Sequence, residues 1–320
     1  MLVRNRFASL LGTGVLLAGA IAAGAWMFRD SGLIDPLPVA EANAAAPLPV
    51  AMQPVAAQPA APQPAAYRSA PTPLASARLV ADALPLPPEL PRIADGPDYD
   101  RCLTLLRTDP AEAMNFAQAW DVTGGGDGAR HCLALAMLGL GEPDRAAERL
   151  ERLAQGSRAG NLARAAIFAQ AALAWMMAND PNRAFGAVTI ALTLSPRDPE
   201  LLVDRSVVLA ALRRFSDSLE DLDAALALEP ERAEAWVLRA AALRHLDRVD
   251  QAIEAVERAL AFAPDNAEGL LERGILRQLR GDVAGARRDW ARVIQLAPES
   301  MAADLATQNL ELSEAGPARR

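Results

Sequence analysis

Small, bulky and polar side chains recur in the second half of the chain with a period of 34 residues. Four successive segments, 165–198, 199–232, 233–266 and 267–300, carry a proline at the same position, and these prolines are Pro196, Pro230, Pro264 and Pro298. Fixed self-similarity at this length is typical of a solenoid, in which one supersecondary unit is stacked several times. The pattern therefore predicts a repeat domain over residues 165–300.

Each segment fits two helices that pack closely. In the third segment Ala252, Val256 and Leu260 belong to one helical stripe, and Pro264 cannot continue that helix. Small residues at the eighth, twentieth and twenty-seventh positions let two helices approach, while bulkier residues at the fourth and twenty-fourth fill the space beside them. The small set is Ala172, Ser206, Ala240, Gly274, Ala184, Ser218, Ala252, Ala286, Ala191, Ala225, Ala259 and Val293; the bulky set is Phe168, Leu202, Trp236, Leu270, Val188, Leu222, Val256 and Trp290.

Small, large and proline positions at this spacing resemble the tetratricopeptide repeat family over residues 165–300. The resemblance implies an all-α solenoid of helical hairpins that binds protein segments on its concave face. The chain departs from the family at the eleventh position of the last segment, where Arg277 replaces an apolar residue. It also departs at the seventh position, where the family often has Leu and this chain has Ala171, Arg205, Arg239 and Arg273.

The pattern continues on both sides in a weaker form. Residues 141–146 align with 247–252, which gives a repeat over about 127–164 with a short insertion near 155–161. Before it we expect helices over 101–107 and 111–122, so that residues 98–164 hold degenerate repeats. After Pro298 we expect a capping helix over 302–312, within a terminal element of residues 301–315. Its polar outer face would be supplied by Gln308, Asn309, Glu311 and Glu314.

Residues 1–30 contain an apolar segment that indicates export. The 22 residues from Phe7 to Phe28 carry no charge, which is enough to span a bilayer, and Arg4 and Arg6 ahead of them would stay in the cytoplasm. We therefore expect a periplasmic protein anchored in the inner membrane by residues 7–28. The alternative is a cleaved signal peptide, because residues 23–25 form a small-residue site, with a soluble periplasmic or secreted product.

Residues 31–97 are interpreted as a Pro/Ala-rich disordered linker. Fifteen of the 24 prolines lie between Pro36 and Pro97, and proline both removes backbone donors and fixes φ. Within this stretch, residues 74–84 have a helix-like apolar spacing, so they form either a short docking helix or a disordered apolar patch.

Composition limits the architecture and the classes of partner that the chain fits. Hydrophobic residues make up 52% of the chain and aromatic residues only 4%, which favours thin layers of Ala-, Leu- and Val-rich helices. Every cation is an arginine, the net charge is −8, and no basic stripe is present, so nucleic acid is not expected as a partner. We expect a protein or peptide partner in the cell envelope, contact with the membrane through the N-terminal segment, and no small-molecule substrate.

The two cysteines, Cys102 and Cys132, are candidates for a disulfide. They fall on the leading helices of adjacent predicted repeats, which pack side by side, and exported proteins meet an oxidising compartment. The alternative is two separately buried thiols. Neither cysteine belongs to a C-x-x-C motif, so the sequence predicts no metal site.

The sequence predicts no catalytic residues and no cofactor. The two histidines, His131 and His245, lie far apart in the repeat array, and a solenoid keeps distant repeats apart. Residues 124–128 are Gly-rich but lack the Gly-Lys-Ser/Thr of a phosphate-binding loop, and they are interpreted as a hinge.

Two rows of charged residues recur with the period. Glu200, Glu234 and Glu268 occupy the second position, where a carboxylate is favoured by the helix dipole; the alternative is an acidic binding row. The arginines at the seventh position are expected to pair with acidic neighbours such as Asp204 and Glu272 in adjoining repeats.

The family resemblance places partner binding on the fifth and ninth positions of each leading helix. Here these residues, with two methionines that add adaptable contact area, are Ala169, Leu173, Met176, Met177, Val203, Val207, Val237, Ala241, Leu271 and Ile275. They lack the Lys and Asn of the family's carboxylate clamps, so we expect an apolar groove suited to an amphipathic or extended segment. The alternative is that tight packing of the repeats, or the chain's own linker, covers this groove.

We therefore expect a non-enzymatic interaction scaffold or adaptor. The alternatives are an accessory subunit of an enzyme that acts on envelope polymers, and a self-associating structural spacer.

Overall fold

The computed structural model describes residues 92–315, and this part of the chain folds into thirteen helices without a strand. The predicted anchor and most of the predicted linker lie outside the described residues. The helices are α2 (Pro97–Thr108), α3 (Pro110–Val122), α4 (Gly126–Gly139), α5 (Pro143–Gly156), α6 (Asn161–Met177), α7 (Pro181–Leu194), α8 (Pro199–Ala211), α9 (Phe215–Leu228), α10 (Ala233–His245), α11 (Val249–Phe262), α12 (Ala267–Leu279), α13 (Val283–Leu296) and α14 (Met301–Ala315).

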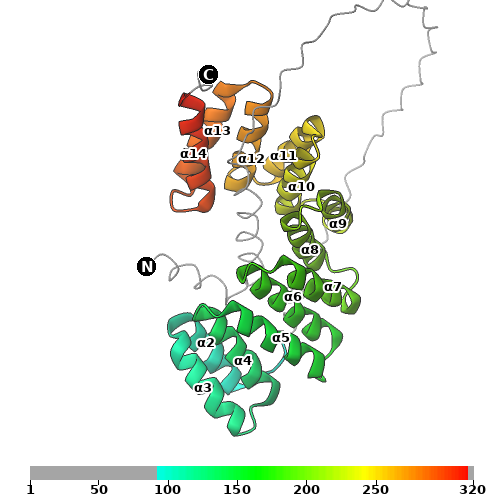
Figure 1. Cartoon of the computed structure of the whole chain (residues 1–320), viewed down its shortest axis with the longest axis vertical. Coiled ribbons are helices and arrows are strands. Elements are labelled where there is room, and N and C mark those ends of the chain that lie inside the picture. The colour runs from blue at the N-terminus through cyan, green and yellow to red at the C-terminus, as the bar shows by residue number, and fades with distance from the viewer. Residues whose placement is uncertain (1–91, 316–320) are drawn as a thin grey trace, which may run out of the picture. The chain divides into compact units, whose positions relative to one another are not determined.

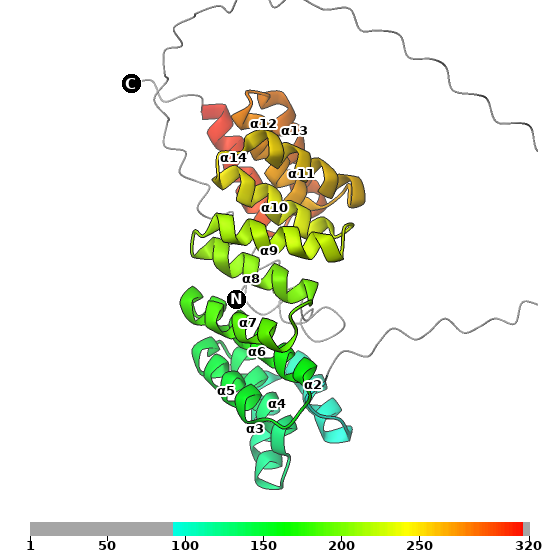
Figure 2. The same ribbon diagram turned by 90° about the vertical axis from the view of Figure 1, so that its right-hand side faces the viewer.

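Consecutive helices form hairpins that stack in chain order, as Figure 1 shows from α2 to α14. Each even-numbered helix from α2 to α12 leads a hairpin and packs on the helix that follows it. The leading helices also contact the leading helices of the next hairpins, α8 against α10 and α10 against α12. In the turned view of Figure 2, α8, α9, α10 and α11 follow one another side by side. The predicted all-α class is confirmed.

Prolines and capping aspartates lie at the helix ends. Trailing helices α7, α9, α11 and α13 each end two residues before a periodic proline, because proline lacks the backbone N–H that the helix requires. Asp109 caps α3 by accepting hydrogen bonds from the N–H groups of Ala111 and Glu112, both at 3.0 Å. Asp198 caps α8 in the same way.

The small periodic positions lie where the two helices of each hairpin meet. Ala240, Ala252 and Ala259, which come from all three small positions of one repeat, are completely buried. Without larger side chains between them, the two backbones come close enough for the Ala, Leu and Val residues around them to fill the core. The predicted core of the repeats is therefore present.

One repeat replaces the alanine of the eighth position by Gly274, and the structure shows why. A Cβ atom added to Gly274 would lie 2.3 Å from Nε1 of Trp290, which occupies the twenty-fourth position of the same repeat. The other repeats combine Ala or Ser at the eighth position with Val or Leu at the twenty-fourth. Gly274 therefore makes room for the larger Trp290 side chain.

Replacing Gly274 with Ala is expected to lower the free energy of unfolding by about 2 kcal/mol, because the 1%-exposed ring of Trp290 has no free space into which it can move. Urea denaturation followed by circular dichroism measures this loss. The control is Gly156→Ala near the end of α5, where an added Cβ meets nothing within 4 Å. An equal effect at the two glycines would contradict the steric explanation.

The Gly-rich stretch that was interpreted as a hinge provides a packing surface. A Cβ at Gly125 or at Gly128 would lie 2.7 Å from the ring of Trp120, so the indole covers both glycines at the start of α4. Glycine is needed here because of this close approach, together with the positive φ of 99° at Gly124 and 56° at Gly126.

Candidate docking surface and its charged residues

The predicted groove residues lie on the four successive leading helices α6, α8, α10 and α12. At the fifth position Val203, Val237 and Leu271 are between 0% and 3% exposed. Leu173, Met176 and Ile275 are partly buried, and Met177 is 43% exposed. Ala169, Val207 and Ala241 are also buried, at 4%, 3% and 0% exposed. Six of the ten predicted residues therefore belong to the core, as the tight-packing alternative expects, and the role of the row in binding stays a prediction.

Carboxylates accompany this row on the same helices. Positions two, five and nine of a helix share a face, so the glutamates of the second position lie beside the apolar row. Glu200 and Glu234 are in the first turns of α8 and α10, as the helix-dipole interpretation expects. In addition both accept hydrogen bonds from Arg232, which lies between the two hairpins; the Arg232–Glu234 distance is 3.3 Å.

Burial and neighbouring negative charges both raise the pKa values of two of these carboxyl groups. Burial raises the pKa of Asp204 well above its ordinary range, and the negative charges of Glu200 and Glu234 raise it further, against the lowering effect of Arg232. The pKa of Glu234 is also raised, mainly by burial, while Arg232 lowers it and Glu200 and Glu268 raise it. The carboxyl groups of Asp204 and Glu234 therefore favour the protonated, neutral form more than a free side chain does.

The seventh-position arginines pair with carboxylates, as the sequence suggested, but two of the three pair within their own hairpin. Arg205 forms a bidentate pair with Asp221, at 2.7 and 2.6 Å, on the trailing helix of its own hairpin. Arg273 pairs with Asp289 in the same way, at 2.9 and 2.8 Å. The predicted partners Asp204 and Glu272 were wrong, because the seventh position faces the trailing helix and not the adjoining leading helix.

The ion-pair partner of the remaining seventh-position arginine, Arg239, is explained by the same geometry. Sixteen residues after Arg239 the chain has Ala255 in place of Asp, so Arg239 turns back to Asp223 on α9, at 2.7 Å. Glu272 is completely buried and pairs with Arg244 of the preceding leading helix, at 2.7 Å.

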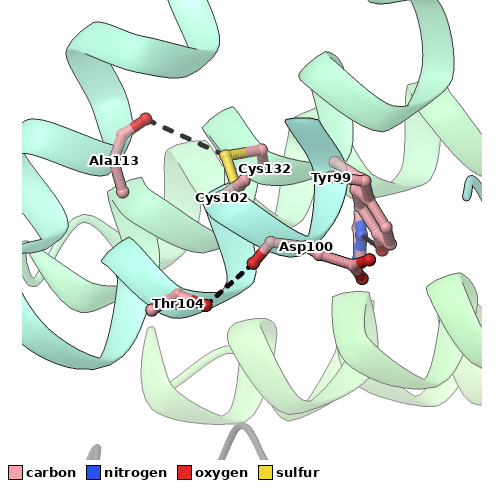
Figure 3. The surroundings of a disulfide bond; sticks show 7 residues. Tyr99, Asp100, Cys102, Thr104, Ala113 and Cys132 are labelled. Carbon is pink, nitrogen blue, oxygen red and sulfur yellow. Dashed lines mark hydrogen bonds between the residues drawn. A yellow bond between two sulfur atoms is a disulfide. The ribbon is translucent and has the colours of Figure 1, made fainter. Parts of the chain in front are cut away.

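The structure brings Cys102 of α2 and Cys132 of α4 together. Their Cα atoms are 6.1 Å apart, within the range that disulfides require, and Figure 3 shows the two sulfurs joined beside Ala113. Both side chains are completely buried. The prediction that leading helices of adjacent repeats place the two cysteines side by side is therefore correct.

A buried polar chain lies next to this pair. The Tyr99 hydroxyl is 2.6 Å from Nδ1 of His131, and Nε2 of His131 is 2.6 Å from Oε1 of Gln170. A neutral imidazole satisfies both contacts when Nε2–H donates to Gln170 and Nδ1 accepts the Tyr99 proton. Burial lowers the pKa of His131 to about 4, although the Gln170 hydrogen bond acts in the opposite direction. Nothing in the spacing of these three residues pointed to the network.

Within residues 92–315 no group of three or more His, Cys, Asp or Glu side chains is placed to hold a metal ion. None of the helices that the structure describes is long and apolar enough to cross a membrane.

Stacked helical hairpins with a repeated inner row define the class: the protein is an α-solenoid. Two models of the tetratricopeptide repeat match the sequence, one over residues 203–267 and the other over 238–311. Together with the in-register hairpins, these matches show that residues 203–311 of this chain are tetratricopeptide repeats.

The solved structures that resemble this chain have low sequence identity to it. The anaphase-promoting-complex hetero-tetramer Cut9–Hcn1 is 19% identical, with a TM-score of 0.52, over 67% of this chain and 42% of that chain. MamA from Desulfovibrio magneticus RS-1 is 21% identical, with a TM-score of 0.48, over 55% of this chain and 97% of that one. A tetratricopeptide repeat protein of Thermus thermophilus is 19% identical, with a TM-score of 0.47, over 57% and 99%. No curated protein matches the sequence.

Proposed function

We propose that this protein is a non-enzymatic scaffold whose leading helices α6, α8, α10 and α12 hold a segment of a partner protein. The tetratricopeptide repeat fold supports an interaction role, since its hairpins present equivalent side chains at regular intervals along one surface. The observation that carries the proposal is the in-register stack of hairpins, in which the leading helices α6, α8, α10 and α12 contact one another in succession.

The scaffold acts in the cell envelope in this proposal. The uncharged segment 7–28 preceded by Arg4 and Arg6 supports export and tethering to the inner membrane, and the Pro-rich stretch after it provides reach. The adjacent cysteines suit an oxidising compartment, in which Cys102 and Cys132 form a disulfide. The partner is then a protein or peptide of the same compartment.

Cross-linking the tagged full chain in membrane fractions is expected to capture a stoichiometric protein. Met177→Asp introduces a charge at a 43%-exposed residue of the predicted groove and is expected to reduce capture about tenfold. Leu228→Asp, at a 44%-exposed apolar residue of trailing helix α9, is the matched control and should capture as the wild type does. Equal capture by all three proteins contradicts groove binding, and a chain recovered only from the cytosol contradicts export.

A further inference from the structure

The first leading helix, α2, is attached to the solenoid by few buried side chains. Of its 12 residues only Tyr99, Cys102 and Leu106 are buried, whereas α10 buries seven of its 13. Two of these three side chains are linked to α4, because Cys102 is bonded to Cys132 and the Tyr99 hydroxyl lies 2.6 Å from Nδ1 of His131. Specific links to one helix thus replace much of the apolar packing that holds α10.

The remaining side chains of α2 contribute little to its docking. Asp98, Asp100 and Thr104 are exposed, so water solvates them whether or not the helix lies on α4. A helix of this length is marginal in water without tertiary contacts, since nucleation is costly and few turns follow. Once α2 leaves α4, it therefore also loses its helical structure.

The neighbouring helix α3 has an anchor of its own on α4. The ring of Trp120 covers Gly125 and Gly128, as the distance of 2.7 Å from an added Cβ at either glycine shows. These contacts involve no residue of α2. The packing of α3 on α4 therefore persists when α2 leaves.

The surface that α2 covers on α4 contains chemically distinctive side chains. Helix α4 buries nine of its 14 residues, among them Cys132 at 0% and His131 at 4% exposed. Both side chains are linked directly to α2. Departure of α2 would therefore give solvent access to a thiol and an imidazole that the docked helix encloses.

We propose that the Cys102–Cys132 bond is a redox-sensitive latch, with α2 docked on α4 in the oxidised chain and undocked in the reduced chain. The bond holds α2 beside α4 at a high effective concentration, and its loss leaves mainly Leu106 and one hydrogen bond to hold the helix. The inference rests on the disulfide of the proposed function and needs no partner protein.

The chemistry of the latch is thiol–disulfide exchange with a small dithiol. The dithiol supplies two electrons and two protons, the S–S bond breaks, each cysteine becomes a thiol, and the dithiol becomes a disulfide. Both sulfurs are completely buried, so the attack requires α2 to open locally first. Oxidation reverses the exchange and docks the helix again.

The first test measures how accessible Cys132 is in the full chain carrying Cys102→Ala, in which it is the remaining cysteine. We expect a maleimide to label native Cys132 at no less than about a tenth of its rate in urea, because the covering helix is undocked. The control is Ser206→Cys in a chain with Cys102→Ala and Cys132→Ala. Ser206 is 0% exposed on α8, so this near-isosteric thiol should stay unlabelled while the array is folded.

The second test follows hydrogen exchange of the wild type before and after treatment with a dithiol. Protection in α2 is expected to fall about a hundredfold on reduction, while protection in α8, α10 and α12 stays unchanged. Reoxidation should restore the original protection of α2, because the exchange is reversible.

The outcomes separate the latch from the alternatives. Native Cys132 that labels as slowly as the Ser206→Cys control would overturn the latch, since the thiols then remain in the core as small apolar side chains. Rapid labelling of both thiols would overturn it as well, because the whole array then unfolds. Free thiols in the unfolded, non-reduced wild type would overturn the latch and the disulfide together, and would leave capture of a partner protein unaffected.

Discussion

Reduction of the Cys102–Cys132 pair is expected to lower the free energy of unfolding by about 3.5 kcal/mol. The bond closes a loop with a sequence separation of 30, and the chain-entropy model gives a stabilisation of this size for such a loop. The loss should be local, because a stacked array unfolds from its weakest end and α2 contacts only the hairpins next to it. Hydrogen exchange should therefore rise first in α2 and α3.

Urea denaturation with and without a thiol reductant measures this effect. The control is the variant Cys102→Ala with Cys132→Ala, which has no bond to reduce and should give the same midpoint under both conditions. The oxidised protein has no free thiol at these positions, so thiol labelling should also be absent after unfolding without reductant. Two labelled thiols in the unfolded, non-reduced chain, with no response to reductant, would show that the cysteines are separate.

The pattern of small residues and prolines was sufficient to predict the fold. Residues such as Ala252 and Pro264 act through local backbone geometry and close helix contact, which depend only on spacing within one repeat. Helix ends were less exact: the helix expected over 302–312 extends over Met301–Ala315, and the one expected from 101 begins at Pro97. Terminal turns depend on capping and neighbouring contacts that periodicity does not contain.

Charge pairing was harder to predict because it depends on which way a long side chain turns. Arg205 and Arg239 occupy the same position of successive repeats, yet one pairs within its own hairpin and the other with the preceding one. The choice follows from whether Asp or Ala lies sixteen residues further along. Arg232 shares Glu200 and Glu234 across a repeat boundary, so its role depends on the stacking of the hairpins.

The candidate site was predicted only in its apolar part. The glutamates at the second position were assigned to helix stabilisation, and Asp204 was assigned to the seventh-position arginines. The structure shows that Arg232 joins Glu200 and Glu234 of neighbouring leading helices. These two glutamates lie one repeat apart in the sequence, and a single sequence gives their spacing but not their separation in space.

Acid is expected to destabilise the first hairpins through His131. Its pKa is lowered to about 4 in the folded chain, against an ordinary value near 6.5, so the folded state binds fewer protons between these two values. The stabilising contribution is therefore fully present above pH 6.5 and is lost as the pH falls to 4. The shift corresponds to a loss of about 3 kcal/mol in the free energy of unfolding over this range.

Urea denaturation at intervals from pH 7 to pH 4 isolates this contribution when the wild type is compared with His131→Gln. The variant starts less stable at pH 7, because the contacts to Tyr99 and Gln170 are altered, but it should lose about 3 kcal/mol less on acidification. The raised pKa values of Asp204 and Glu234 act in the opposite direction in both proteins and cancel in the comparison. Parallel slopes for wild type and His131→Gln would show that His131 is not the buried neutral base.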